Sequence, residues 1–267
     1  MGMIQLPEEK YIQIDEKLPI SIFDLQRKIL QPNIDLLLAA AVHDSFKNQK
    51  NPETKIDIAA VCLRDSVDVA CDVVYALRKA NENLIWYREQ HPEAPREMEA
   101  CRFAKFYADD AALRLYASGE HIANFIIYFL DIPAADIKFH KKSNASISSA
   151  VGKYLNDTSN NQNISQYINV LLKGDSWLKT IDYRNHWVHE QPPLMEGQGI
   201  VYERRNRLKK TAKGYSVGIT LGDTPQFTID SLISMVTNAT NDFVRLLENL
   251  VAVWFNHIDS LGIKLKG

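Results

Sequence analysis

The sequence predicts an all-α protein: a helical bundle of four long helices plus shorter ones, with a small β-hairpin inserted before the last helix. Two observations support this prediction. Apolar residues recur every three or four positions along long stretches, which is the spacing that gives a helix one apolar face. Short polar connections separate these stretches, and such connections favour antiparallel packing. No linker divides the chain, so residues 1–267 are predicted to form a single domain.

The long helices are predicted at residues 20–47, 55–90, 96–131 and 228–260. Within the first of them, Pro32 is expected to break or kink the helix, because proline lacks the amide hydrogen that a helical hydrogen bond needs. Shorter helices are predicted at residues 146–156, 164–173 and 176–190.

After Pro192 and Pro193 the apolar residues alternate with polar ones, which is the pattern of a half-buried strand. Residues 194–224 are therefore predicted to form a β-hairpin inserted in the helical domain. Its first strand is the most basic segment of the chain and contains Arg204, Arg205, Arg207, Lys209 and Lys210. One interpretation is a charged edge strand that resists aggregation, and the other is contact with RNA.

The chain has 46% hydrophobic and 24% charged residues, and 31 basic and 33 acidic side chains give a net charge of -2. This balance excludes a global basic field that attracts nucleic acid, so contact with RNA would need a local basic patch. No apolar run approaches the ~20 residues of a membrane span. No signal sequence, with basic and then apolar residues, opens the chain. We therefore expect a cytoplasmic protein without a membrane partner.

No cofactor or metal is expected. Asp65, Asp68 and Asp72 share one helix face, which we interpret as solvated rather than as a metal site. His186 and His189 have a spacing that is open to zinc, but no third ligand lies within reach in the sequence. Free thiols, buried in a reducing compartment, are expected at the cysteines Cys62, Cys71 and Cys101.

Polar side chains interrupt the apolar stripe of the helix predicted at 96–131. One of its faces carries Asp109, Leu113, Tyr116 and Glu120. Asp110 and Arg114 are expected to form an ion pair, because they lie four residues apart on the helix. Glu120 and His121 stand in apolar surroundings, and these two are candidates for the wall of a functional cleft.

The stretch 182–190 is the one long polar run that a solvated helix face does not explain. It sets an arginine, two histidines, an amide and two carboxylates around a tryptophan and a valine. At about 100° per residue, Arg184 lies on the same helix face as Trp177, Ile181 and Val188. A buried guanidinium needs an anion, which can be a carboxylate, a phosphate or an acid of a partner subunit.

His189 follows Arg184 by five residues and lies about 140° around the helix from it, so the two do not share a narrow face. We expect them to converge only where the helix frays before Pro192, or across a two-fold axis. Asn185 can orient either group or a substrate oxygen. An arginine and a histidine can cleave a phosphodiester without metal, because imidazole moves protons near neutral pH and guanidinium stabilises charge on the phosphoryl oxygens.

Arg184-Asn185-x-x-x-His189 resembles the Arg-x4-6-His motif of the HEPN superfamily (higher eukaryotes and prokaryotes nucleotide-binding), in the form where a polar residue follows the arginine. The resemblance covers the helices from residue 55 to 189 and the last helix. It implies that Arg184 and His189 are catalytic and that Asn185 supports them. Glu120, as an acidic partner on an earlier helix, and His186 are the other expected supporting residues.

The same resemblance implies the function: a metal-independent endoribonuclease that cleaves RNA in a toxin–antitoxin or antiviral defence role. It implies an all-helical fold and a homodimer whose two motifs form one composite cleft. An antitoxin or another protein would be a further partner. These properties are expectations for the chain.

Two alternatives remain open. The chain can be a non-catalytic helical module that binds a nucleotide or a partner protein, with Arg184 as a structural or phosphate-binding cation. Arg184 can also serve structure alone, paired with Asp182 or Glu120. A carboxylate-bridged metal bundle would need Glu-x-x-His pairs on facing helices, a spacing that Glu120 and His121 do not have.

Overall fold

The computed structural model describes residues 10–47, 56–90, 98–133, 162–189, 193–195, 209–212, 214–216 and 225–261, with the single residues 137, 147 and 151. Its helices are α1 (Tyr11–Asp15), α2 (Ile20–Lys47), α3 (Ile56–Gln90), α4 (Met98–Phe129), α6 (Gln162–Leu172), α7 (Asp175–His189) and α8 (Ile229–Ser260). Two short strands are β1 (Lys209–Thr211) and β2 (Gly214–Ser216). The prediction of an all-α fold is confirmed, and each of the long helices ends within two residues of its predicted bounds.

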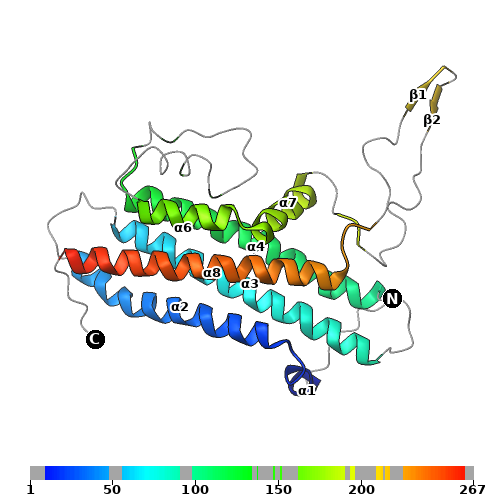
Figure 1. Cartoon of the computed structure of the whole chain (residues 1–267), viewed down its shortest axis with the longest axis horizontal. Coiled ribbons are helices and arrows are strands. Elements are labelled where there is room, and N and C mark those ends of the chain that lie inside the picture. The colour runs from blue at the N-terminus through cyan, green and yellow to red at the C-terminus, as the bar shows by residue number, and fades with distance from the viewer. Residues whose placement is uncertain are drawn as a thin grey trace.

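The long helices α2, α3, α4 and α8 lie side by side along the length of the molecule (Figure 1). α8 is the central helix, because it contacts α2, α3, α4, α6 and α7. Its buried side chains form one broad apolar face, among them Leu232, Val236, Phe243, Leu247 and Trp254. Several helices are needed to cover a face of this breadth, which explains the position of α8.

The start of α8 is fixed by a capping box. The Thr228 hydroxyl accepts a hydrogen bond from the Ser231 amide at 3.0 Å, and the Ser231 hydroxyl accepts one from the Thr228 amide at 2.9 Å. These bonds satisfy amide hydrogens that the first turn of a helix cannot pair internally. The chain before α8 is held by a bridge between Met195 and Phe227, which ties the segment after α7 to the beginning of α8.

α3 and α4 form the most extensive helix–helix contact of the described residues. Two buried serines join the helices reciprocally. Ser66 Oγ donates to the carbonyl oxygen of Ser118 at 3.0 Å, and Ser118 Oγ donates to the carbonyl oxygen of Ser66 at 2.7 Å. Both hydroxyls are therefore satisfied inside an otherwise apolar contact, where an unpaired hydroxyl would be costly.

α2 continues through Pro32, so of the predicted break or kink the break does not occur. A proline inside a helix removes one hydrogen bond and costs about 3 kcal/mol. Packing offsets this cost, because Pro32 is buried together with Ile22, Leu25 and Ile29 of the same helix. The sequence pattern indicates the local effect of a proline but not the tertiary contacts that offset this effect.

β1 and β2 pair antiparallel, with Lys209 opposite Ser216 and Thr211 opposite Gly214. Gly214 has φ of 128°, a left-handed backbone conformation that glycine adopts without the clash of a Cβ atom. Most of the segment 194–224, predicted as a hairpin, lies outside the described residues.

Other predictions also fall outside the described residues. They include the basic residues Arg204, Arg205 and Arg207, and most of the short helix predicted at 146–156. Lys209 is described only through its backbone pairing in β1. None of the described helices is long and apolar enough to cross a membrane.

Candidate functional site

α7 carries the motif, and its first half is anchored in the core. The indole of Trp177 is buried and stacks on Phe243 of α8, with ring centroids 5.6 Å apart and an interplanar angle of 9°. Gly119 of α4 lies close to the same ring, and a Cβ atom there would lie 3.3 Å from Trp177 Cη2. Thr180 and Ile181 are buried in the next turn. α7 therefore sits close against both α4 and α8.

Arg184 is half-buried on the face that continues from Trp177 and Ile181. Its guanidinium carbon lies 3.8 Å from the ring centroid of Tyr116 on α4, which is a cation–π contact. Its Nη1 donates to Asn185 Oδ1 at 3.0 Å. Its Nε is buried and has no hydrogen-bond partner among the described residues. Among the described residues, the face of an aromatic ring thus holds the cation.

Arg184 and His189 meet within one chain. Arg184 Nη1 lies 3.5 Å from His189 Nε2, although α7 remains helical up to His189. The expectation that the pair converges only by fraying or across a two-fold axis is therefore wrong. The arginine side chain is long enough to cross the angular offset that separates the two positions on the helix. His189 itself is exposed, so its imidazole is open to a ligand.

Asn185 is half-buried, and its Oδ1 accepts a hydrogen bond from Arg184. His186 is exposed, and its Nε2 lies 3.7 Å from Asp182 Oδ2 on the preceding turn. The structure therefore groups Arg184, Asn185 and His189 and sets His186 beside Asp182.

Asp109 of α4 is the residue that fastens the second half of α7. Its Oδ1 accepts a hydrogen bond from the Tyr183 hydroxyl at 2.5 Å. Its Oδ2 accepts from Lys105 Nζ at 2.6 Å and from Trp187 Nε1 at 3.1 Å. Only 12% of the Asp109 side chain and 10% of the Lys105 side chain are exposed. The buried carboxylate is thus compensated by one cation and two neutral donors.

Tyr183 is locked into this network as a neutral phenol. Burial raises its pKa above the ordinary value of 10.0, and the neighbouring negative charge of Asp109 raises it further. The ring also packs edge-on against Phe227, with centroids 5.4 Å apart. Tyr183 and Trp187 flank Arg184 in the sequence, so Asp109 fixes the helix on both sides of the arginine.

Glu120 and His121, the candidates for the wall of a cleft, both lie on α4. Glu120 is half-buried on α4, and its Oε1 is enclosed. His121 Nδ1 lies 4.0 Å from Asp65 Oδ2 on α3. Arg184 makes polar and ring contacts with Tyr116, Asn185 and His189.

The sequence placed Asp109 and Tyr116 on one face of α4 but gave them no role. A signal was present for Asp109. Lys105 and Asp109 are four residues apart on a mostly apolar face, which is typical of a charge pair that supports burial. No local signal identifies Tyr116, because its contact with Arg184 joins residues that are distant in the sequence.

The acidic residues of α3 pair with cations. Arg114 contacts Asp72 at 2.7 Å and Asp110 at 2.9 Å, so the expected pair of Asp110 and Arg114 is confirmed. Asp68 lies 3.8 Å from Arg64. Within the described ranges, no group of three or more histidine, cysteine or acidic residues could hold a metal ion. Cys62 and Cys71 are free and half-buried, and burial raises the pKa of both thiols.

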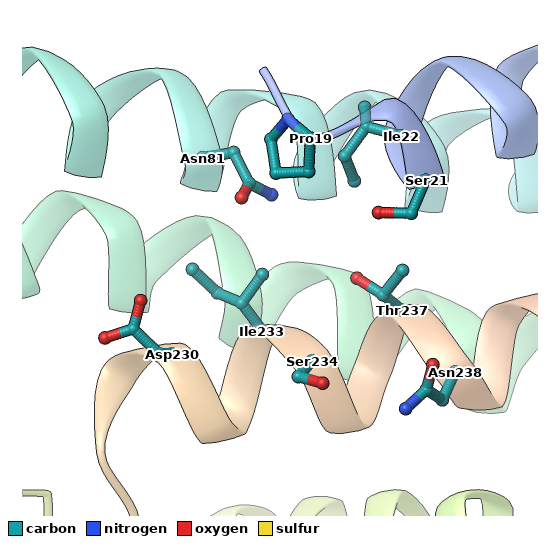
Figure 2. Close-up of a pocket in the computed structure, with 9 residues that line it drawn as sticks. All are labelled: Pro19, Ser21, Ile22, Asn81, Asp230, Ile233, Ser234, Thr237 and Asn238. Carbon is teal, nitrogen blue, oxygen red and sulfur yellow. The ribbon is translucent and has the colours of Figure 1, made fainter. Parts of the chain in front are cut away.

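A separate hollow of about 240 Å³ lies between the start of α2, the second half of α3 and the first turns of α8. Figure 2 shows Ser21 and Asn81 on one side of it, facing Ser234, Thr237 and Asn238 of α8 on the other. Its polar lining consists mainly of hydroxyl and amide groups. No residue of α7 lines it, so the motif and this hollow are separate features.

Comparisons with protein-family models, with curated proteins and with solved structures found no match to the chain. The function is therefore argued from the geometry around Arg184 and His189.

Proposed function

We propose that this protein is a metal-independent endoribonuclease of the HEPN type that acts on RNA in a toxin–antitoxin or antiviral defence role. In this proposal it is a single helical domain with an inserted hairpin, and it works as a homodimer. The observation that carries the proposal is the 3.5 Å approach of Arg184 Nη1 to His189 Nε2 at the exposed end of α7. A fixed cation thereby stands beside an accessible imidazole.

The chemistry assigns one task to each group. The His189 imidazole removes the proton of a ribose 2′-hydroxyl, and the 2′-oxygen attacks the adjacent phosphorus. The bond from phosphorus to the 5′-oxygen breaks, which leaves a 2′,3′-cyclic phosphate and a 5′-hydroxyl once the leaving oxygen has taken up a proton. Arg184 stabilises the negative charge that develops on the non-bridging oxygens. The ring of Tyr116 and the amide of Asn185 hold the guanidinium in place for this task.

A homodimer would complete the proton transfers. One histidine acts as the base, and the proton for the leaving oxygen needs an acid on the opposite side of the phosphate. A second copy of His189 can supply that acid when two α7 ends face each other. Val188 is exposed beside His189, and its apolar surface fits such a contact.

The test is RNA cleavage in the presence of EDTA, with wild type compared with His189→Ala and Arg184→Ala. Loss of the base is expected to lower the rate by roughly 10²–10⁴-fold. Loss of the arginine is expected to lower it by roughly 10²–10³-fold, the usual effect of removing one charge-stabilising donor. Arg184→Lys keeps the charge and loses the planar cation over Tyr116, so partial activity is expected.

His121→Ala is the matched control, because it removes a half-buried histidine of α4 that the site does not contain. The control should cleave at the wild-type rate. The proposal fails if wild type cleaves no RNA, or if Arg184→Ala and His189→Ala cleave as fast as the control.

A second candidate function is a non-catalytic module that binds a nucleotide or a partner protein. The exposed apolar residues Trp187 and Val188 next to Arg184 favour it, because such surface commonly marks a contact. Nucleotide binding without turnover, weakened by Arg184→Ala at unchanged stability, would support this candidate over the endoribonuclease.

A further inference from the structure

Trp187 has two properties that packing alone does not require: a partly exposed ring and a hydrogen-bonded indole nitrogen. Its surface remains 36% exposed at the open end of α7. Its Nε1 nevertheless points inward and donates to Asp109 Oδ2 at 3.1 Å. The hydrogen bond to Asp109 therefore fixes the orientation of the ring, while part of the ring stays in contact with solvent.

The acceptor of that hydrogen bond is itself immobilised. Asp109 also accepts hydrogen bonds from Lys105 and Tyr183, and its carboxylate is almost fully buried. An aromatic ring held in this way loses little conformational freedom when a ligand packs on it, so less binding energy is spent on ordering the side chain.

Trp187 also lies next to the proposed catalytic cation. It follows Arg184 by three residues, which makes the two side chains neighbours on adjacent turns of α7. The guanidinium is held on the ring of Tyr116 from α4. A phosphate bound by Arg184 therefore places the attached nucleoside within the neighbourhood of the Trp187 ring.

We propose that Trp187 is the nucleobase-stacking platform of the site, and that Asp109 is the residue that positions it. This inference rests on the proposed function as a ribonuclease and adds how the site contacts its substrate. Because Asp109 already takes the indole N–H, the exposed part of Trp187 offers no hydrogen-bond donor to the edge of a base. It can recognise a base only through its aromatic face.

Recognition by stacking alone tolerates every base and favours those with the larger ring system. The expected specificity is therefore a preference for purine over pyrimidine beside the bound phosphate, without discrimination by hydrogen-bonding edges. Salt weakens phosphate contacts and affects stacking less, so this preference should persist when the overall affinity falls with ionic strength.

The test is binding of fluorescent 12-nucleotide 2′-O-methyl oligo(A) and oligo(U), at one fixed salt concentration, measured by anisotropy. These probes lack the nucleophilic hydroxyl, so binding is recorded without cleavage. Wild type should bind oligo(A) more tightly than oligo(U). Trp187→Ala should weaken oligo(A) binding by roughly 5- to 150-fold, which is the range for losing one stacking aromatic, and should remove the preference for oligo(A).

Two variants separate stacking from support of the fold. Trp187→Phe keeps an aromatic face and loses the hydrogen bond to Asp109, so it should retain most of the preference. Tyr75→Ala removes an aromatic side chain of α3 that is 58% exposed, and it should behave as wild type.

The inference is overturned if Trp187→Ala binds both oligonucleotides as wild type does, or weakens both by one common factor. It is also overturned if a wild-type dimer becomes a monomer in Trp187→Ala on gel filtration, since Trp187 would then be an interface residue. If the purine preference depends on Trp187 but unmodified RNA is not cleaved, the platform stands and the endoribonuclease fails. A wild type that binds neither oligonucleotide overturns the platform, and the cleavage of unmodified RNA then decides separately on the endoribonuclease.

Discussion

The two halves of α7 are held in different ways, although they belong to one helix. The first half is buried through Trp177, Thr180 and Ile181, which pack between α4 and α8. The second half is attached to α4 through polar and ring contacts, and its last turn is exposed. The buried contacts that stabilise the fold thus lie at one end of the helix, and the proposed reactive groups lie at the other. Substitution of the reactive groups should therefore lower the free energy of unfolding only slightly, whereas substitution of the buried residues in the first half should lower it strongly.

The largest expected effect is at the anchor. Trp177→Ala empties a buried site between Gly119 and Phe243, and it should lower the free energy of unfolding by about 3–5 kcal/mol. Leu178→Ala is the control on the next residue, which is 43% exposed, and should change stability by less than about 1 kcal/mol. Urea denaturation measures both. Equal losses of stability in the two variants would show that the buried face of α7 does not anchor the helix more strongly than its exposed face.

Asp109→Asn is expected to have the next largest effect, because it leaves the buried ammonium of Lys105 without its counter-charge. Breaking a buried pair from one side costs roughly 3–5 kcal/mol, and the small remaining exposure places this case near the lower limit. Amide hydrogen exchange in residues 184–189 should also accelerate. Asp72→Asn removes an acid that pairs with Arg114 at the exposed surface, and it should cost less than about 1 kcal/mol.

An unchanged exchange rate in Asp109→Asn would contradict the proposed fastening of the second half of α7 by α4. A loss as large in Asp72→Asn would show that burial does not distinguish the two ion pairs.

Tyr183, where the two halves join, provides a dependence on pH. The pKa of its phenol is raised in the folded protein, so the folded state keeps the proton when the unfolded chain releases it. Stability is then fully present below the ordinary pKa of 10.0 and declines as the pH rises above it. One such group contributes a slope of up to about 1.4 kcal/mol per pH unit. Tyr183→Phe should reduce the slope between pH 10 and 11 by this amount, and an unchanged slope would contradict the assignment.

The smallest expected effects are the stability changes on replacing each of two buried threonines. Thr180 Oγ1 has no hydrogen-bond partner within the described residues, whereas Thr240 Oγ1 donates to the carbonyl oxygen of Val236 at 2.7 Å. Replacing Thr180 by valine removes a desolvated hydroxyl and should raise stability by about 1 kcal/mol. Thr240→Val loses a hydrogen bond and should lower stability by about as much. Thermal unfolding of both variants would refute the comparison if the two shifts had the same sign.

The sequence predicted the helices well, because their boundaries depend on local patterns. The apolar stripe of α8 and the threonine at its start give the observed helix, Ile229–Ser260, to within one residue of the predicted start. Pro32 shows the limit of local reasoning, since burial keeps α2 intact where proline alone predicts a break.

The candidate site could be predicted only in part. The motif residues Arg184, Asn185 and His189 are adjacent in the sequence, so their spacing was visible. Their approach was not visible, because angular position on a helix does not include the reach of an arginine side chain. The roles of Asp109 and Tyr116 depend on how α4 lies against α7, which is a non-local contact that no spacing encodes.

The reciprocal bonds between Ser66 and Ser118 have a consequence for this site. A slip of α4 along α3 by one turn would displace it by about 5.4 Å and would strand both hydroxyls in an apolar contact. The two serines therefore hold α4 in a single register against α3. Asp109 and Tyr116 belong to α4, so the contact of α4 with α3 also determines how far Arg184 of α7 lies from its aromatic support.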